Sequence, residues 1–239
     1  MIKWLEDAVF YEVYPQSFRD SNGDGIGDIP GITEKLEYIQ ELGCNALWIN
    51  PCFTSPFYDA GYDVEDYYSV APRYGTNEDL KKLFEAAHQR GMHVLLDLVP
   101  GHTAVTHPWF QESMKAEKNE YTDRYVWTDS LYKRMEDVKG IVSVLRGISP
   151  RPASCGVNCF STQPALNYGF ANITDAGWQQ PTDAPGPMAT REELKNIMRF
   201  WLTLGCDGFR VDMAGSLVKN DEDKKEMRTE EEFILGNLG

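Results

Sequence analysis

The sequence predicts an α/β fold made of repeated strand–helix units, either a (β/α) barrel or a doubly wound open sheet. Three observations lead to this prediction. Short β-rich runs alternate with longer helical patterns along the chain. Two of the strand-forming segments repeat each other closely. Polar residues follow the carboxyl ends of the strands, which is where both folds place their active sites.

Four strands are expected, each bounded by a proline, a glycine turn or a polar residue. They run over Ala8 to Tyr14, Ala46 to Asn50, His93 to Val99 and Gly208 to Val211. Three helices are expected between them, each ended by a glycine. They are Ile32 to Leu42, Asn77 to Arg90 capped by Thr76, and a helix that ends at Leu204 and begins with a Thr190-x-x-Glu193 capping box.

The segment from Leu42 to Asn50 matches the segment from Leu204 to Asp212. Each begins with Leu-Gly-Cys and leads into a strand with a polar residue at its end. No Gly-x-Gly-x-x-Gly phosphate loop follows any strand, which favours the barrel over a nucleotide-binding open sheet.

A long stretch between Thr103 and Thr190 interrupts this regular pattern. It is rich in aromatic residues, proline and glycine and has little periodicity. A structureless loop of that length is improbable in a compact domain, so an inserted subdomain over the strand-end face is expected. The segment from Lys219 to Glu232 is mostly charged and is expected to be a solvated helix or a frayed tail.

The composition narrows the class of partner. The chain has 239 residues, of which 42% are apolar, so it can bury a sizeable core. Its net charge of −14 disfavours nucleic acid and anionic membranes, and a neutral substrate or a cation fits better. No apolar run approaches a membrane span and no leader pattern is seen, which favours the cytoplasm. Five cysteines do not indicate a disulfide framework, although Cys155 and Cys159 are close enough in sequence to pair or to share a metal.

An oxygen-rich loop after the first strand has the spacing of a calcium site. Asp20, Asn22, Asp24 and Asp28 stand at the first, third, fifth and ninth places, and Ile26 offers a backbone carbonyl at the seventh. Hard cations prefer such ligands, so a structural Ca²⁺ or Mg²⁺ is expected. The alternative is an Asx-turn without metal.

The fourth strand carries an arginine and a carboxylate two residues apart. Arg210 and Asp212 should face the same side of a strand, and a cation beside a carboxylate keeps it ionised. That suits a nucleophile. A structural ion pair would give the same pattern.

Four ordered motifs resemble the α-amylase family of glycoside hydrolases over essentially the whole chain. They are the strand and metal loop from Val9 to Asp28, the turn from Gly61 to Tyr67, the segment from Asp97 to His102, and Gly208 to Asp212. The segment Gln163-Pro164-Ala165-Leu166-Asn167 is similar to one in the family's α-glucosidase and oligo-1,6-glucosidase branch, where Asp usually stands at Ala165.

The resemblance implies a fold and roles for five residues. The fold is a TIM (β/α)8 barrel of the α-amylase type, of which the chain holds the first four βα units, with domain B inserted after the third strand. Asp212 would be the nucleophile of a retaining mechanism and Arg210 its positioning cation. Asp63 and His102 would hydrogen-bond the sugar in the reacting subsite, and the Tyr62 ring would stack on it.

Two further residues of the third strand region are noted. Asp97 is expected to orient its neighbours rather than react. Gly101 replaces the Asn that usually precedes the histidine, which puts in question any metal or hydrogen-bonding role at that position.

The resemblance also implies domain boundaries and an incomplete catalytic pair. Residues 1–102 would form the first three barrel units, 103–175 domain B, and 176–239 the next helix, the fourth strand and a charged tail. The general acid Glu and a third carboxylate are not found, and Glu230 to Glu232 lie in a charged run without a strand. The chain is therefore expected to be the N-terminal half of an enzyme, inactive alone, whose partner would be the missing half of the barrel.

The expected substrate is an oligosaccharide with α-linked glucose. A transglycosylase such as a trehalose synthase or sucrose isomerase is an alternative within the same family. From another class, the chain could be a non-catalytic barrel that serves as a binding domain, like the amino-acid transporter heavy chains. The presence of Arg210, Asp212, Asp63 and His102 together disfavours that alternative.

Overall fold

The computed structural model describes residues 3–221, which divide into two compact units. Within the described residues, unit 1 consists of 3–62, 66–98 and 197–211, and unit 2 of 63–65, 99–196 and 212–221. Helix α7, Pro185–Leu204, has its first part in unit 2 and its last part in unit 1. Residues 222–239, which include most of the expected charged tail and Glu230 to Glu232, lie outside the described part of the chain.

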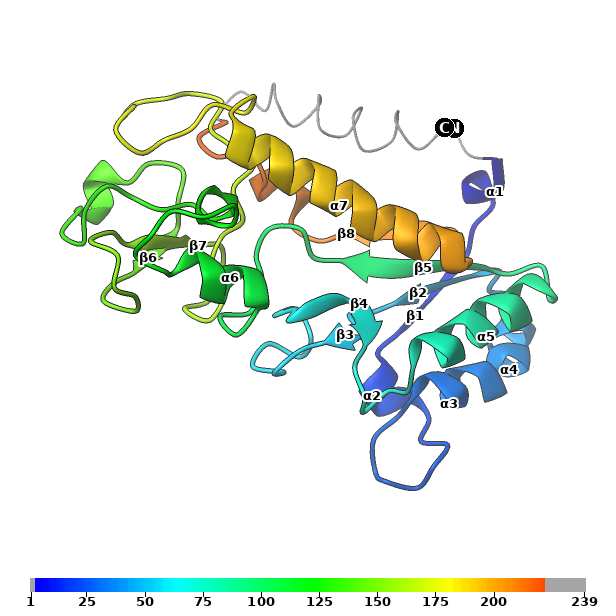
Figure 1. Ribbon diagram of the computed structural model, residues 1–239. Helices are drawn as coiled ribbons and strands as arrows, with labels where there is room; N and C mark the ends of the chain where they lie inside the picture. The colour runs from blue at the N-terminus through cyan, green and yellow to red at the C-terminus, as the bar shows by residue number, and fades with distance from the viewer. Residues whose placement is uncertain (1–2, 222–239) are drawn as a thin grey trace. The chain divides into compact units, whose positions relative to one another are not determined.

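Unit 1 is built on a parallel sheet of four strands in the order β1-β2-β5-β8 (Figure 1). The strands are β1 Phe10–Val13, β2 Ala46–Ile49, β5 His93–Leu98 and β8 Gly208–Val211. Its helices are α1 Lys3–Glu6, α2 Pro15–Phe18, α3 Ile29–Glu34, α4 Leu36–Glu41 and α5 Asn77–His88, and a short antiparallel pair is formed by β3 Phe53–Thr54 and β4 Asp66–Val70. All four expected strands are therefore confirmed, each within a few residues of its expected ends.

One face of this sheet is apolar and packs beneath helices. Leu47 and Ile49 of β2 and Val94, Leu96 and Leu98 of β5 are fully buried. Helix α5 packs against β5, and α3 packs against α5. Since strand side chains alternate between faces, Trp48 and Asp97 point to the other side, where the polar residues gather.

Local sequence signals confirm α5 as expected. Thr76 accepts a hydrogen bond from the Asp79 backbone, and the Asp79 side chain accepts one from the Thr76 backbone, so the two form a capping box. The two segments matched in the sequence also agree in structure. Gly43 and Gly205 both have positive φ angles, of 85° and 116°, and a strand begins three residues after each. A glycine is favoured at such angles because other residues are strained there.

The expected helix from Ile32 to Leu42 is confirmed in part, because the region is helical but is divided into two short helices at Lys35. Helix α3 begins at Ile29, where the Asp28 side chain accepts a hydrogen bond from the Gly31 backbone and caps the first turn. The chain then leaves helical geometry at Lys35, with φ of −106° and ψ of 6°, before α4 begins.

The expected capping box at Thr190 is wrong. Helix α7 begins at Pro185, and Thr190 lies inside it with its hydroxyl donating to the carbonyl of Gly186 at 3.1 Å. Proline fits the first turn of a helix, where its missing N–H costs nothing, so Pro185 marks the true start. A Thr-x-x-Glu pattern inside a helix cannot act as a cap.

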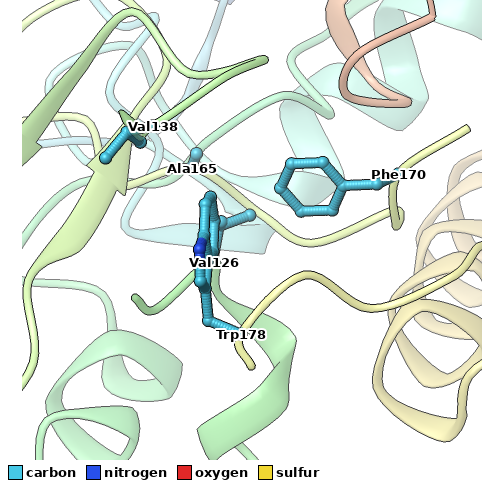
Figure 2. Close-up of a cluster of buried hydrophobic side chains, with 5 residues drawn as sticks. All are labelled: Val126, Val138, Ala165, Phe170 and Trp178. Carbon is cyan, nitrogen blue, oxygen red and sulfur yellow. The ribbon is translucent and has the colours of Figure 1, made fainter. Parts of the chain in front are cut away.

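Unit 2 contains short helices, 3-10 turns and strands, which the weak periodicity of its sequence did not predict. It contains α6 Pro108–Ser113, the 3-10 turns η1 Thr122–Arg124, η2 Met135–Asp137 and η3 Ala214–Ser216, and an antiparallel pair of β6 Ser143–Leu145 and β7 Cys155–Val157. Its apolar cluster joins Val126, Val138, Ala165, Phe170 and Trp178 (Figure 2).

Residue 165 lies within this cluster. Ala165 has no exposed surface and packs within the apolar cluster. An ionised carboxylate would be costly among these side chains. All five cysteines are free thiols, so Cys155 and Cys159 are not paired.

Candidate active site

The polar face of the parallel sheet in unit 1 carries a cluster centred on Asp97. The register pairs Asp97 of β5 with Arg210 of β8. Arg210 Nη1 donates to Asp97 Oδ1 at 3.0 Å, and Trp48 Nε1 donates to Asp97 Oδ2 at 3.0 Å. The Tyr62 hydroxyl donates to the same Oδ2 at 3.2 Å. Three neighbouring elements are thereby tied to one buried carboxylate.

Further contacts extend this cluster to the first strand. Asn50, directly after β2, donates from Nδ2 to the Tyr62 hydroxyl at 3.2 Å and to Glu12 Oε1 at 3.1 Å. The Arg210 guanidinium also lies over the Trp48 ring, 4.9 Å from its centroid. The chain therefore holds Arg210 by an ion pair on one side and a cation–π contact on another.

Burial raises the pKa of the Asp97 carboxyl to about 6, and the hydrogen bonds from Arg210, Trp48 and Tyr62 oppose this rise. Burial also raises the pKa of Tyr62 to about 12. Tyr62 thus remains a neutral phenol at physiological pH. Asp97 is a carboxylate whose protonation is sensitive to its surroundings, and its contacts fit the orienting role expected from the sequence.

Two of the expected sugar-binding residues lie in unit 2. Asp63 is fully buried and His102 is 1% exposed. They belong to adjoining segments, because the carbonyl of Val64 accepts a hydrogen bond from the backbone of Ala104 at 2.8 Å. Asn158 contacts His102, with Nδ2 and Nδ1 3.2 Å apart.

The nucleophile candidate lies just beyond its strand. Strand β8 ends at Val211, so Asp212 is the first residue after it, and Met213 then adopts a left-handed φ of 50°. Asp212 is partly buried and belongs to unit 2, whereas Arg210 belongs to unit 1. The alternation of side chains along a strand therefore does not by itself place Asp212 on the face of Arg210.

The candidate metal loop is held by its own side chains. The Asp20 carboxylate accepts hydrogen bonds from the backbones of Asn22, Gly23 and Gly25, and these bonds lower its pKa, with that from Gly25 contributing most. Asp28 accepts from Ser21 through Oδ2 and from Gly31 through Oδ1.

The chemistry of this loop allows a cation site, but its carboxylates do not form a preassembled cluster. Within residues 3–221 no group of three or more His, Cys, Asp or Glu side chains is arranged to hold a metal. The donor set of carboxylate, amide and carbonyl oxygens nevertheless suits Ca²⁺ or Mg²⁺. Asp20 Oδ1 and Asp28 Oδ2 each accept two hydrogen bonds within the loop, so a cation would have to compete with these bonds. In the described chain no helix is long and apolar enough to cross a membrane.

Three residues of these clusters were missed by sequence reasoning. Trp48 and Asn50 alternate at the end of a strand, a pattern that places both on the polar face and could have drawn attention to them. Asn158 had no local signal, because its importance comes from contacts with residues far away in the sequence.

The fold and these clusters agree with the match of residues 12–237 to the family model described as the catalytic domain of α-amylase. The chain therefore belongs to the α-amylase family of glycoside hydrolases.

Several relatives in this family have known names. The chain is 38% identical to an oligo-1,6-glucosidase of Bacillus sp. (strain F5) over 219 residues, which are 92% of this chain and 40% of the relative. It is 42% identical to the trehalose synthase/amylase TreS of Mycolicibacterium smegmatis over 224 residues, or 91% of this chain and 35% of that protein. The chain thus spans about two fifths of the length of these relatives.

Solved structures show the same likeness. Amy13B of Eubacterium rectale superposes with a TM-score of 0.77 at 30% identity, covering 96% of this chain and 41% of that one. The α-glucosyl transfer enzyme XgtA superposes with a TM-score of 0.74 at 38% identity, covering 89% and 37%.

Proposed function

We propose that this chain provides the nucleophile and the sugar-binding residues of a retaining enzyme that acts on α-linked glucosides, as an α-glucosidase or oligo-1,6-glucosidase does. The observation that carries the proposal is the Asp97 cluster, which fixes Arg210 and Tyr62 by direct hydrogen bonds. In barrel enzymes catalytic groups stand at the carboxyl ends of strands, where this cluster lies.

Each expected residue has a role in the proposed reaction. Asp212 would attack the anomeric carbon, with Arg210 as its positioning cation. Asp63 and His102 would hydrogen-bond the hydroxyls of a terminal glucose, and the Tyr62 ring would stack on its apolar face. A retaining mechanism requires a second carboxyl group about 5 to 5.5 Å from the nucleophile. No such group is assigned among the described residues, and without one the turnover of ordinary glucosides should be poor.

The finer details of the fold belong to the same proposal. The four strands of unit 1 would be the first four of an eight-stranded barrel, 1–102 would hold the first three units, 103–175 would be domain B, and 176–239 would complete the fourth unit. The Asp20, Asn22 and Asp24 side chains, the Ile26 carbonyl and Asp28 would hold a structural Ca²⁺ or Mg²⁺.

Transfer of glucose to another sugar is the second candidate function. It is favoured by the 42% identity to a trehalose synthase/amylase and by the 38% identity to an α-glucosyl transfer enzyme. Both candidates use the same nucleophile, so the first experiment tests what they share.

Covalent trapping tests Asp212 without the general acid. In 5-fluoro-α-glucosyl fluoride the leaving group is fluoride, which needs no protonation. We expect the chain to gain one fluoroglucosyl group on Asp212, detected by intact mass and peptide mapping, and Asp212→Asn to gain none. Labelling of Asp97 instead of Asp212 would show that our proposal names the wrong residue as the nucleophile. If neither residue were labelled, the chain would have no functional nucleophile and the proposal would be rejected.

A further inference from the structure

Gly101 and Asn158 share one small space in unit 2. A Cβ atom built on Gly101 would lie 2.5 Å from Nδ2 of Asn158, closer than real Cβ contacts occur. Gly101 does not have the positive φ that favours glycine, so its backbone conformation would accept another residue. The space beside residue 101 is instead filled by the amide of Asn158.

The orientation of that amide is fixed by its other end. Asn158 Oδ1 accepts a hydrogen bond from Lys219 Nζ at 3.3 Å and one from Ser216 Oγ at 3.4 Å. A lysine ammonium can only donate, so the atom facing it must be the oxygen. Lys219 is itself held in place, because it is 5% exposed and donates to the carbonyl of Ser216 at 2.6 Å.

The opposite end of the amide then determines the proton position on His102. Asn158 Nδ2 carries only donors and lies 3.2 Å from His102 Nδ1. Nδ1 must therefore accept, and the ring carries its proton on Nε2. His102 is 1% exposed, so bulk water does not readily replace this hydrogen bond.

We propose that Asn158 is a positioning residue that holds His102 in the Nε2–H tautomer, so that Nε2 is the nitrogen that donates to a sugar hydroxyl. The sugar contact rests on the proposed function, but the tautomer is a property of the free protein. The inference also accounts for Gly101. Asn158 supplies an amide beside His102, and Gly101 leaves the room for it.

Nuclear magnetic resonance of ¹⁵N-labelled histidine rings tests the tautomer directly. The chain has four histidines, so each ring can be assigned from one His→Gln variant. We expect His102 Nδ1 to resonate as an unprotonated nitrogen and Nε2 as a protonated one. In Asn158→Asp the carboxylate can only accept, so the proton should move to Nδ1 or the ring should become doubly protonated.

Two variants separate this effect from general loss of packing. Asn167→Asp is the matched control, because Asn167 is 4% exposed in the same unit and its amide bonds to Asp123, Gln180 and Gly169. It should leave the His102 spectrum unchanged. Gly101→Ala should displace Asn158 and alter the tautomer population, whereas Gly101→Ala combined with Asn158→Ala should regain thermal stability relative to Gly101→Ala but not the wild-type His102 spectrum.

The result with sugar distinguishes the two proposals. Methyl α-glucoside should shift the His102 Nε2 resonance, and Asn158→Asp should weaken its binding by about fivefold, the loss of about 1 kcal/mol typical of a hydrogen bond. A wild-type Nδ1–H tautomer, or an unchanged tautomer in Asn158→Asp, would overturn the positioning role. The expected tautomer with no response to sugar would uphold that role and instead count against the proposed function.

Discussion

Arg210 Nη1 lies 3.0 Å from Asp97 Oδ1, and the two residues are register partners on adjacent parallel strands. The pair is unequal in burial, because the Asp97 side chain has no exposed surface and that of Arg210 is 36% exposed. Removing the arginine would leave a buried carboxylate without its cation. This difference in burial determines how substitutions of Arg210 and of Asp97 should affect the stability of the chain.

The first prediction is that Arg210→Met destabilises the chain at pH 7.5 by about 2 kcal/mol. Breaking a fully buried pair typically costs about 3 to 5 kcal/mol, and the partial exposure of Arg210 reduces this. Urea unfolding measures the loss. Arg19→Met is the matched control, since Arg19 forms a surface pair with Glu34 at 3.1 Å and should cost less than about 1 kcal/mol. Equal losses in the two variants would show that Asp97 does not depend on Arg210.

The second prediction concerns pH. The folded pKa of Asp97 is raised from 3.8 to about 6, so between these values the folded state binds more protons than the unfolded state. The contribution of Asp97 to stability should therefore be fully present below pH 3.8 and be lost as the pH rises towards about 6.

Unfolding free energies of wild type and Asp97→Asn at pH 4 to 7 check this prediction. The difference between the two proteins isolates Asp97 from other titrating groups. We expect the wild type to lose about 2 kcal/mol relative to Asp97→Asn over this interval. A constant difference across the interval would mean that the folded pKa of Asp97 is not raised.

The third prediction contrasts two threonines. Thr76→Ala should destabilise the chain by about 1 kcal/mol, because Thr76 caps α5. Thr190→Val should change stability by less than about 0.5 kcal/mol, because the Thr190 hydroxyl only donates to a carbonyl inside α7. Thermal and urea unfolding would measure both variants. A cost at Thr190 as large as that at Thr76 would contradict this contrast between a cap and a threonine inside a helix.

The fourth prediction is that Ca²⁺ or Mg²⁺ raises the melting temperature in proportion to the logarithm of its concentration, once the site is nearly saturated. A ligand that binds only the folded state stabilises it in this way. Asp24→Ala should abolish the shift, because Asp24 supplies an oxygen at the fifth loop position. Asp183→Ala, an exposed carboxylate elsewhere, is the control. Calorimetric titration without heat, together with no shift in melting, would leave the loop as a turn without metal.

The fifth prediction concerns substrate mode and requires the remaining part of a barrel, supplied by fusing this chain to the matching region of the Bacillus sp. (strain F5) oligo-1,6-glucosidase. Asp63→Asn should lower kcat/KM on maltose and isomaltose at least tenfold, since a hydrogen bond to a charged group contributes about 1.5 to 3 kcal/mol. Glu65→Gln, two residues away, is the control. Rapid internal cleavage of starch by the unmodified fusion would contradict recognition of a terminal glucose.

Signals carried by residues close together in the sequence were sufficient to predict much of the secondary structure of unit 1. The Thr76 and Asp79 pair caps a helix because both partners lie within one turn, and Gly43 and Gly205 end helices because positive φ favours glycine. Because such signals are local, they also led to the wrong helix cap at Thr190. Thr190 has the pattern of a cap, but a pattern cannot show whether its backbone has already become helical.

The sequence also showed the family resemblance and the motif formed by Arg210 and Asp212. Both depend only on residue type and spacing. The sequence did not show the partners of those residues. Asp97 meets Arg210, Trp48 and Tyr62 only because parallel strands and a turn bring their ends together.

Only the tertiary structure determined which residues form the core of unit 2 and which side chain contacts His102. Val126 and Trp178 join one apolar cluster although no periodic pattern links them (Figure 2). Gly101 leaves room for the amide of Asn158, which lies far along the chain. Sequence determines which local conformations are favourable, whereas the packing of distant segments determines which side chain fills a given space and which atom of a histidine carries its proton.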